Sequence, residues 1–210
     1  MDWQTLLYNF ITLMVVLDPV GTSAVFAALT PDMDKKQRRY TAEKATMLST
    51  LILVVFAFVG AKLLTALGVS LPAFRIAGGL MLFFLAIDMV FARPSGFRSS
   101  TAAENREAEE RHDITVFPLA FPLIAGPGAM TTVVLLMGRA AGHPLQVISV
   151  LAVLLATLVV VLVSLLAASQ LRKALGVTGS NVITRVLGIL LAALAVQFVL
   201  DGLVEVFVKN

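Results

Sequence analysis

The chain has 210 residues, of which 59% are hydrophobic and 14% are charged, and its formal net charge is +3. Soluble domains are roughly 45–50% apolar and about 25% charged, so this composition excludes an ordinary soluble domain and indicates that lipid surrounds much of the chain. The sequence has no cysteine, which excludes disulfides, thiolate catalysis and cysteine-ligated metal sites.

Six apolar stretches follow one another along the sequence. Each is long enough to cross a hydrocarbon core about 30 Å thick, and a helix is the form in which such a segment satisfies its own backbone inside lipid. We therefore predict an all-α polytopic membrane protein with six transmembrane helices. The predicted spans, in chain order, are Thr5–Thr30, Thr41–Leu67, Leu71–Ala92, Ile114–Gly138, Pro144–Leu171 and Asn181–Phe207.

Basic residues gather in alternate connections between these spans. The first connection holds four, the long third connection at 93–113 mixes four arginines with acidic residues, and the fifth holds Arg172 and Lys173. Cytoplasmic loops carry the excess of lysine and arginine, so these three connections are predicted to face the cytoplasm. Both termini are then predicted to lie outside.

The two halves of the chain resemble each other at two places. Pro19 and Pro127 are each followed by small and hydroxylated residues, and Arg75 and Arg185 each begin an Arg-x-x-Gly-x-Leu pattern. We predict one membrane domain built from a repeat over residues 1–92, a charged cytoplasmic connection over 93–113 and a second repeat over 114–210. Because each repeat has three spans, the second copy is inverted, an arrangement typical of secondary transporters.

Two of the predicted spans contain helix breakers near mid-depth, Asp18-Pro19-Val20-Gly21 in the first and Gly126-Pro127-Gly128 in the fourth. Proline removes a backbone donor and glycine permits unusual backbone angles beside it. A simple kink is the alternative at either place, but two breakers at matching depths favour interrupted helices. Asp18 and Pro19 suit an N-cap followed by a first-position proline, so half-helices are predicted to begin at Pro19 and Pro127.

The amino ends of the two half-helices predict a binding site for a small zwitterion. Such an end exposes unpaired N–H groups and a partial positive charge, which favour a carboxylate. The carboxylate of Asp18 would pair with the ammonium group of the substrate. Alternatively, Asp18 is only a helix cap or is a proton carrier. The predicted substrate-binding residues are Asp18, Pro19, Gly21, Thr22, Ser23, Gly126, Pro127, Gly128, Ala129, Met130, Thr131 and Thr132.

Other residues of the spans carry smaller expectations. Arg75 and Arg185 are expected to snorkel or to pair with a loop residue. Gly78 and Gly79, with the Ala192–Ala195 stretch, predict close packing of helices. Gln197 is expected to face a cavity or to bond a neighbouring helix. The residues expected to line the cavity with apolar groups are Val25, Phe26, Phe121 and Met130.

The stretch Asp18-Pro19-Val20-Gly21-Thr22 through Phe26, and the stretch Phe121-Pro122-Leu123-Ile124-Ala125-Gly126-Pro127-Gly128-Ala129-Met130-Thr131, resemble two signatures of the MarC family. The resemblance spans the whole chain, including its length and its charged middle connection. It implies a bacterial inner-membrane protein that transports small neutral amino acids such as alanine, glycine or serine. It also implies discontinuous first and fourth helices around the site. One departure is Ala24, where many members have proline.

The leading prediction is a secondary transporter that exports small neutral amino acids by alternating access around a midplane site. It needs no cofactor or metal, its partners are the zwitterionic substrate, the bilayer and a coupling proton or sodium ion, and it has no nucleic-acid role. The alternative is a membrane scaffold or regulatory protein that transports nothing. An enzyme is not expected, because both histidines, His112 and His143, fall in connections.

Overall fold

The structure is a computed structural model that describes residues 3–91 and 114–207. These residues form helices and turns without a strand. The connection predicted over 93–113, with His112, lies outside the described residues, as does Ala92. The helices, in chain order, are α1 (Trp3–Leu17), α2 (Pro19–Leu29), α3 (Lys35–Ala66), α4 (Leu71–Phe91), η1 (Thr115–Ile124), α6 (Pro127–Ala140), α7 (Pro144–Leu166) and α8 (Ala168–Phe207).

The lengths and apolar content of these helices match a membrane protein. Five helices or joined helices are long and apolar enough to cross a bilayer, and η1 with α6 makes a sixth span that is bent by 52° at its break. Large apolar side chains such as Phe58, Val159 and Ile189 lie exposed on the outer faces, where they suit contact with lipid. The prediction of an all-α polytopic membrane protein is confirmed.

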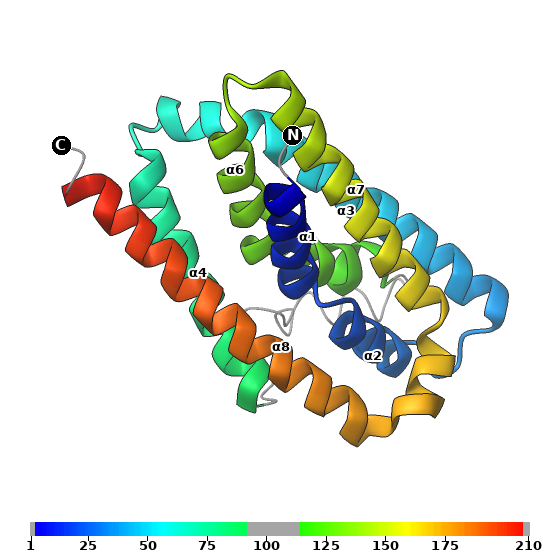
Figure 1. The fold of residues 1–210 in the computed structure, drawn as a ribbon. Coiled ribbons are helices and arrows are strands. Elements are labelled where there is room, and N and C mark those ends of the chain that lie inside the picture. Colours follow the sequence, from blue (N-terminus) through cyan, green and yellow to red (C-terminus); the bar gives the residue numbers. More distant parts are fainter. Residues whose placement is uncertain (1–2, 92–113, 208–210) are drawn as a thin grey trace.

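The helices of the second half run opposite to their counterparts in the first half. In Figure 1, α2 continues downward from α1, whereas α6 rises from the middle of the molecule. The helix α3 rises while α7 descends, and α4 descends while α8 rises. Each half-helix therefore starts inside the molecule and runs toward a different end of it, in the directions that an inverted copy requires.

The outer helix α4 packs along its whole length on the second half of α8 through glycines. A Cβ atom at Gly79 would lie 2.7 Å from the carbonyl oxygen of Ala195, one at Gly188 would lie 2.8 Å from the Cβ of Met89, and one at Gly202 would lie 3.0 Å from the carbonyl oxygen of Pro72. A similar Cβ at Gly78 would lie 1.9 Å from the Cγ2 of Thr131 on α6. The predicted close packing at Gly78, Gly79 and Ala195 is confirmed.

Two helix boundaries differ from the prediction. The helix α3 begins at Lys35 and not at Thr41, because Asp34 and Gln37 form a capping box, with the Gln37 N–H donating to Asp34 Oδ1 over 2.7 Å. The predicted connection after Leu171 is itself helical. The helix α8 already starts at Ala168 and changes direction at Gly176, whose φ of 63° is left-handed.

The buried arginine of α4 is paired across helices. Arg75 is buried and its Nη1 lies 2.7 Å from Glu205 Oε2, so α4 and α8 are also joined by an ion pair. Arg185, which occupies the matching position of the second half, is exposed. Arg75 thus pairs with a neighbouring helix rather than with a connection. Gln197 donates to Asp201 on its own helix at 2.6 Å.

Candidate functional site

The first predicted helix is interrupted at Asp18. This residue has φ 43° and ψ 69°, a left-handed conformation that aspartate adopts more readily than most residues. It is fully buried, and its Oδ1 accepts a hydrogen bond from the Gly21 N–H at 3.0 Å. Pro19 occupies the first turn of α2, where its missing N–H leaves no donor unsatisfied. The predicted N-cap and first-position proline are confirmed.

The fourth predicted helix is interrupted more severely. Phe117 and Phe121 have extended backbone angles, because each precedes a proline, and a following proline disfavours the helical region. The chain then passes close over itself, so that a Cβ atom at Gly126 would lie only 2.4 Å from the carbonyl oxygen of Pro122. A residue with a side chain does not fit this crossing, and Gly126 serves as the N-cap of α6 without a side-chain hydrogen bond.

The two half-helices therefore differ in how many backbone N–H groups at their amino ends are already hydrogen-bonded. The N–H of Gly21 is held by Asp18, and the N–H of Thr22 donates to the Asp18 carbonyl oxygen at 2.9 Å. In α6 the N–H of Met130 donates to the Gly126 carbonyl oxygen at 3.0 Å, but those of Gly128 and Ala129 have no hydrogen bond to a described residue. The amino end of α6 keeps its positive character.

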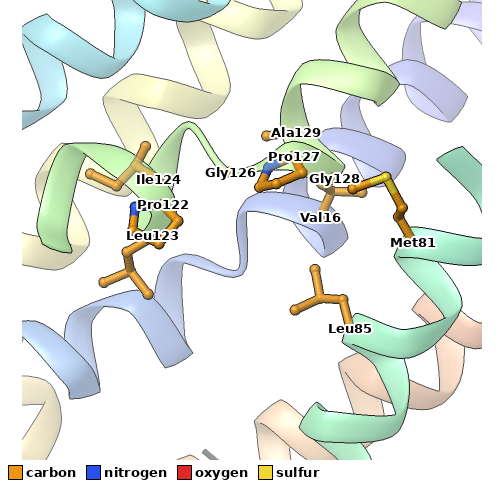
Figure 2. Close-up of a pocket in the computed structure, with 10 residues that line it drawn as sticks. All are labelled: Val16, Met81, Leu85, Pro122, Leu123, Ile124, Gly126, Pro127, Gly128 and Ala129. Carbon is orange, nitrogen blue, oxygen red and sulfur yellow. The ribbon is translucent and has the colours of Figure 1, made fainter. Parts of the chain in front are cut away.

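A small cavity lies at this amino end, and we call it the central cavity (Figure 2). It leaves about 20 Å³ for the centre of a water molecule, enough for about one water. Figure 2 shows Val16, near the end of α1, beside Gly128, with Met81 and Leu85 closing the wall from α4. The complete lining is Val16, Met81, Leu85, Pro122, Leu123, Ile124, Gly126, Pro127, Gly128 and Ala129.

Four of the twelve predicted binding residues line the central cavity, namely Gly126, Pro127, Gly128 and Ala129. The others lie around the breaks without lining it. Asp18, Pro19, Thr22, Ser23, Thr131 and Thr132 are buried, and Gly21 and Met130 are half-buried. Ser23 lies on a different and mostly apolar hollow between α2 and the start of α8.

The hydroxyl groups near the breaks mostly bond their own helices. Thr22 donates to the carbonyl oxygen of Leu17 at 2.9 Å, Ser23 to that of Val20 at 2.8 Å, and Thr132 to that of Gly128 at 2.8 Å. The methyl group of Thr131 packs on Gly78. These hydroxyls stabilise the broken backbone, because a carbonyl group inside a membrane has no water to bond.

Sequence reasoning missed six residues of the cavity wall. Pro122, Leu123 and Ile124 precede the second break, within the signature stretch but outside the predicted site. Val16, Met81 and Leu85 are apolar residues within long apolar stretches, so no local signal separates them from residues that face lipid. Their positions in the sequence offer one signal: Val16 is two residues before Asp18, and Met81 and Leu85 are three and seven residues after Gly78, on the same face of a helix. The apolar residues expected in the wall, Phe121 and Met130 among them, do not belong to the lining.

The family model described as "MarC family integral membrane protein" matches residues 3–207. The chain belongs to the MarC family. Both signature stretches of this MarC protein, around Asp18 and around Gly126, therefore coincide with the two helix interruptions.

Relatives of this MarC protein occur in archaea and in bacteria. A "UPF0056 membrane protein" of Archaeoglobus fulgidus is 38% identical over 96% of this chain and 93% of its own length. One of Aquifex aeolicus is 37% identical over 92% of this chain and 90% of its own length. The "UPF0056 membrane protein YvbG" of Bacillus subtilis is 34% identical over 99% of this chain and 98% of its own length. No solved structure matches the chain.

These names state a membrane location and no reaction. The fold and the comparisons together make this chain a multi-pass integral membrane protein of the MarC family.

Proposed function

We propose that this MarC protein is a secondary transporter that exports small neutral amino acids, such as alanine, glycine or serine, across the cytoplasmic membrane. The observation that carries the proposal is the amino end of α6, where Gly128 and Ala129 offer unpaired N–H groups to a buried cavity. In this proposal both termini face the outside, and the coupling ion is a proton or a sodium ion.

The amino end of α6 suits a carboxylate. Backbone N–H groups that point into a cavity, together with the partial positive charge of the helix, stabilise an anion without a charged side chain. Pro127 removes a competing donor at the first position of α6, and Gly128 keeps the backbone open to the ligand. A substrate carboxylate would accept from the N–H groups of Gly128 and Ala129.

The walls favour a small substrate side chain. Val16, Met81 and Leu85 present apolar groups opposite the backbone of Gly128. The cavity leaves space for about one water molecule, which is less than alanine requires, so this conformation corresponds to a closed state of the transporter. Transport requires the wall from α4 to withdraw from α6, and the same wall sets an upper limit on substrate size.

Asp18 has a structural task in this mechanism. Its carboxylate caps α2 and holds the left-handed turn at the break, which positions the end of α1 and therefore Val16 at the cavity. The zwitterion is then bound chiefly through its carboxylate at α6. The mechanism does not require Asp18 to pair with the substrate ammonium group or to carry a proton.

The proposal is tested by flux through purified protein in liposomes. Liposomes loaded with unlabelled alanine should accumulate labelled alanine by exchange, and Gly128→Ala should reduce this exchange at least about tenfold. The added methyl group would lie 2.7 Å from the Cδ2 of Leu82, and it would cover the N–H groups that meet the carboxylate.

Gly138→Ala is the matched control. It adds the same methyl group to the same helix, at 2.8 Å from the Cδ2 of Leu71, away from the central cavity, and should leave exchange unchanged. Absence of exchange in the unaltered protein, together with no thermal stabilisation by any neutral amino acid, would favour a scaffold or regulatory protein. Equal exchange by Gly128→Ala and Gly138→Ala would remove the site at α6.

A further inference from the structure

A second cavity lies where the first turns of α1 meet the last turns of α6 and the start of α7. It leaves about 390 Å³ for the centres of water molecules, far more than the central cavity. The residues of its lining that matter here are Tyr8, Asn9, Leu136, Arg139, Gln146 and Ser149. They come from α1, α6 and α7, so three helices converge on this cavity.

Asn9 is the first indication that the second cavity binds a solute. Asn9 is only 5% exposed, and it forms no hydrogen bond with any described residue. Its amide nitrogen and oxygen are not fully enclosed by the protein, so they open onto the cavity, where water or a solute can bond them. Asn9 offers one acceptor and two donors to whatever occupies the cavity.

Arg139 is the second indication, and it supplies the charge. Its Nη2 donates to Asp201 Oδ2 at 2.6 Å, and its guanidinium group lies 5.9 Å from the ring centre of Tyr8 and 5.9 Å from that of Phe198. These contacts hold the side chain at the cavity, yet they use only one of its five N–H donors in the described structure. The remaining donors match the two oxygens of a carboxylate.

The second cavity and the central cavity lie at the two ends of one seam between helices. On α1, Asn9 lines the second cavity and Val16 lines the central one, seven residues or about 10 Å apart along the helix. On α6, Leu136 and Ala129 do the same, again seven residues apart. Both pairs have the helical spacing that puts residues on one face.

A polar group also lies part of the way along the seam. Thr12 follows Asn9 by three residues, on the same face of α1. It is buried, and its Oγ1 has no hydrogen-bond partner among the described residues. A hydroxyl in a helix ordinarily bonds the carbonyl oxygen four residues earlier, as Thr157 does with Val153. Thr12 therefore provides a polar step between the two cavities.

We infer that the second cavity is a binding site for a small zwitterionic amino acid, on the side of the membrane that bears the N-terminus of α1, which an exported substrate reaches after it leaves the central cavity. Arg139 takes the carboxylate, and the Asn9 carbonyl oxygen accepts from the ammonium group. Ser149 Oγ, which already donates to the Gln146 carbonyl oxygen at 2.7 Å, retains acceptor capacity for the same group. This inference rests on the proposed function and adds a second site to it.

The absence of cysteine from the sequence makes the test direct, because one introduced thiol is the only thiol in the protein. Gln146→Cys puts a reporter at the exposed mouth of the second cavity, and its reaction with a membrane-impermeant maleimide is followed in nanodiscs. Alanine should slow this reaction at least about tenfold at saturation, whereas propionate and alaninamide, which each lack one of the two charges, should slow it far less. Leu145→Cys is the matched control, since Leu145 is exposed beside the cavity without lining it, and alanine should not protect its thiol.

Two further variants locate the binding groups. In the Gln146→Cys background, Asn9→Leu should raise the alanine concentration for half-protection about tenfold, since it removes the amide while conserving shape. Arg139→Gln should abolish protection. A thermal unfolding midpoint within a few degrees of the parent protein checks that each variant is folded. If Arg139→Gln does not fold, Asn9→Leu alone still tests the site.

The combination of Gln146→Cys with Gly128→Ala separates this site from the central cavity. It should lose alanine exchange and keep alanine protection at position 146. If the unaltered protein exchanges alanine but alanine does not protect the thiol at position 146, the second site is overturned and the proposed transport function stands. If alanine protects the thiol but no exchange occurs, the second site stands and the transport function is overturned. Loss of protection on Gly128→Ala would show that only the central site binds, and would also overturn the inference.

Discussion

The carboxylate of Asp18, which is fully buried, accepts a hydrogen bond from the backbone N–H of Gly21 at 3.0 Å in the turn that separates α1 from α2. The matching turn before α6 has Gly126 in the place of Asp18 and has no such bond. One half-helix is therefore capped by the protein itself, and the other is left open to a ligand.

Asp18→Ala should destabilise the protein by about 1–2 kcal/mol, because it removes the cap of α2 and puts alanine in a left-handed conformation. Asp18→Asn should cost much less, since asparagine caps helices as well as aspartate and tolerates positive φ. Unfolding by denaturant in mixed micelles measures both changes. Equal stability of Asp18→Ala and the unaltered protein would contradict the capping role.

Gly21→Ala should be about as destabilising as Asp18→Ala, since a Cβ atom at Gly21 would lie 2.1 Å from Asp18 Oδ2 and would displace the carboxylate. The two changes remove the same bond, so their effects should not add. A double-mutant cycle should give a coupling free energy of roughly 0.5–3 kcal/mol between the two positions. Additive losses would mean that Gly21 is needed for another reason.

Glu205→Gln should destabilise the protein by about 2 kcal/mol, because it leaves the guanidinium group of Arg75 without its negative partner. The side chain of Arg75 is 9% exposed in this pair, and that of Glu205 is 36% exposed. The control is Glu43→Gln, which breaks an ion pair with Arg39 whose side chains are 46% and 72% exposed, and should cost less than about 0.5 kcal/mol. Similar losses in the two variants, measured by unfolding in micelles, would argue against a special role for the buried pair.

Gly79→Ala should destabilise the pairing of α4 and α8 by about 1–3 kcal/mol, because its methyl group would meet the backbone oxygen of Ala195, which cannot rotate away. Gly138→Ala meets only the flexible end of Leu71 and should cost clearly less. The two variants differ in what the methyl group meets and not in its size. If both unfold at the same denaturant concentration, close backbone approach is not what limits this interface.

The sequence alone was sufficient for the membrane class, the number of spans and the positions of both breaks. These features depend on composition, on hydrophobic length and on the local conformational limits of proline and glycine, all of which are properties of short segments. The capping of α2 by Asp18 followed from the same local chemistry, since an aspartate directly before a proline suits a helix start.

The cavity wall and the paired charges required the three-dimensional arrangement. Met81 and Leu85 stand in a continuous apolar stretch, where residues that face lipid and residues that face a cavity have the same composition. The pairing of Arg75 with Glu205 joins residues that are 130 positions apart. The early start of α8 was missed because Arg172 and Lys173 suggest a connection, although both lie exposed on the surface of a helix.

The three glycine contacts between α4 and α8 have a mechanical consequence. Gly202 touches α4 beside Pro72, Gly79 touches α8 beside Ala195, and Gly188 touches α4 beside Met89, so α4 is held against the second half of α8 near both of its own ends and in its middle. In the proposed transport cycle, a pair joined at three points would move as one stiff unit. An outward swing near Pro72 would then bring the end near Met89 inward, so the two faces of the membrane would not open together.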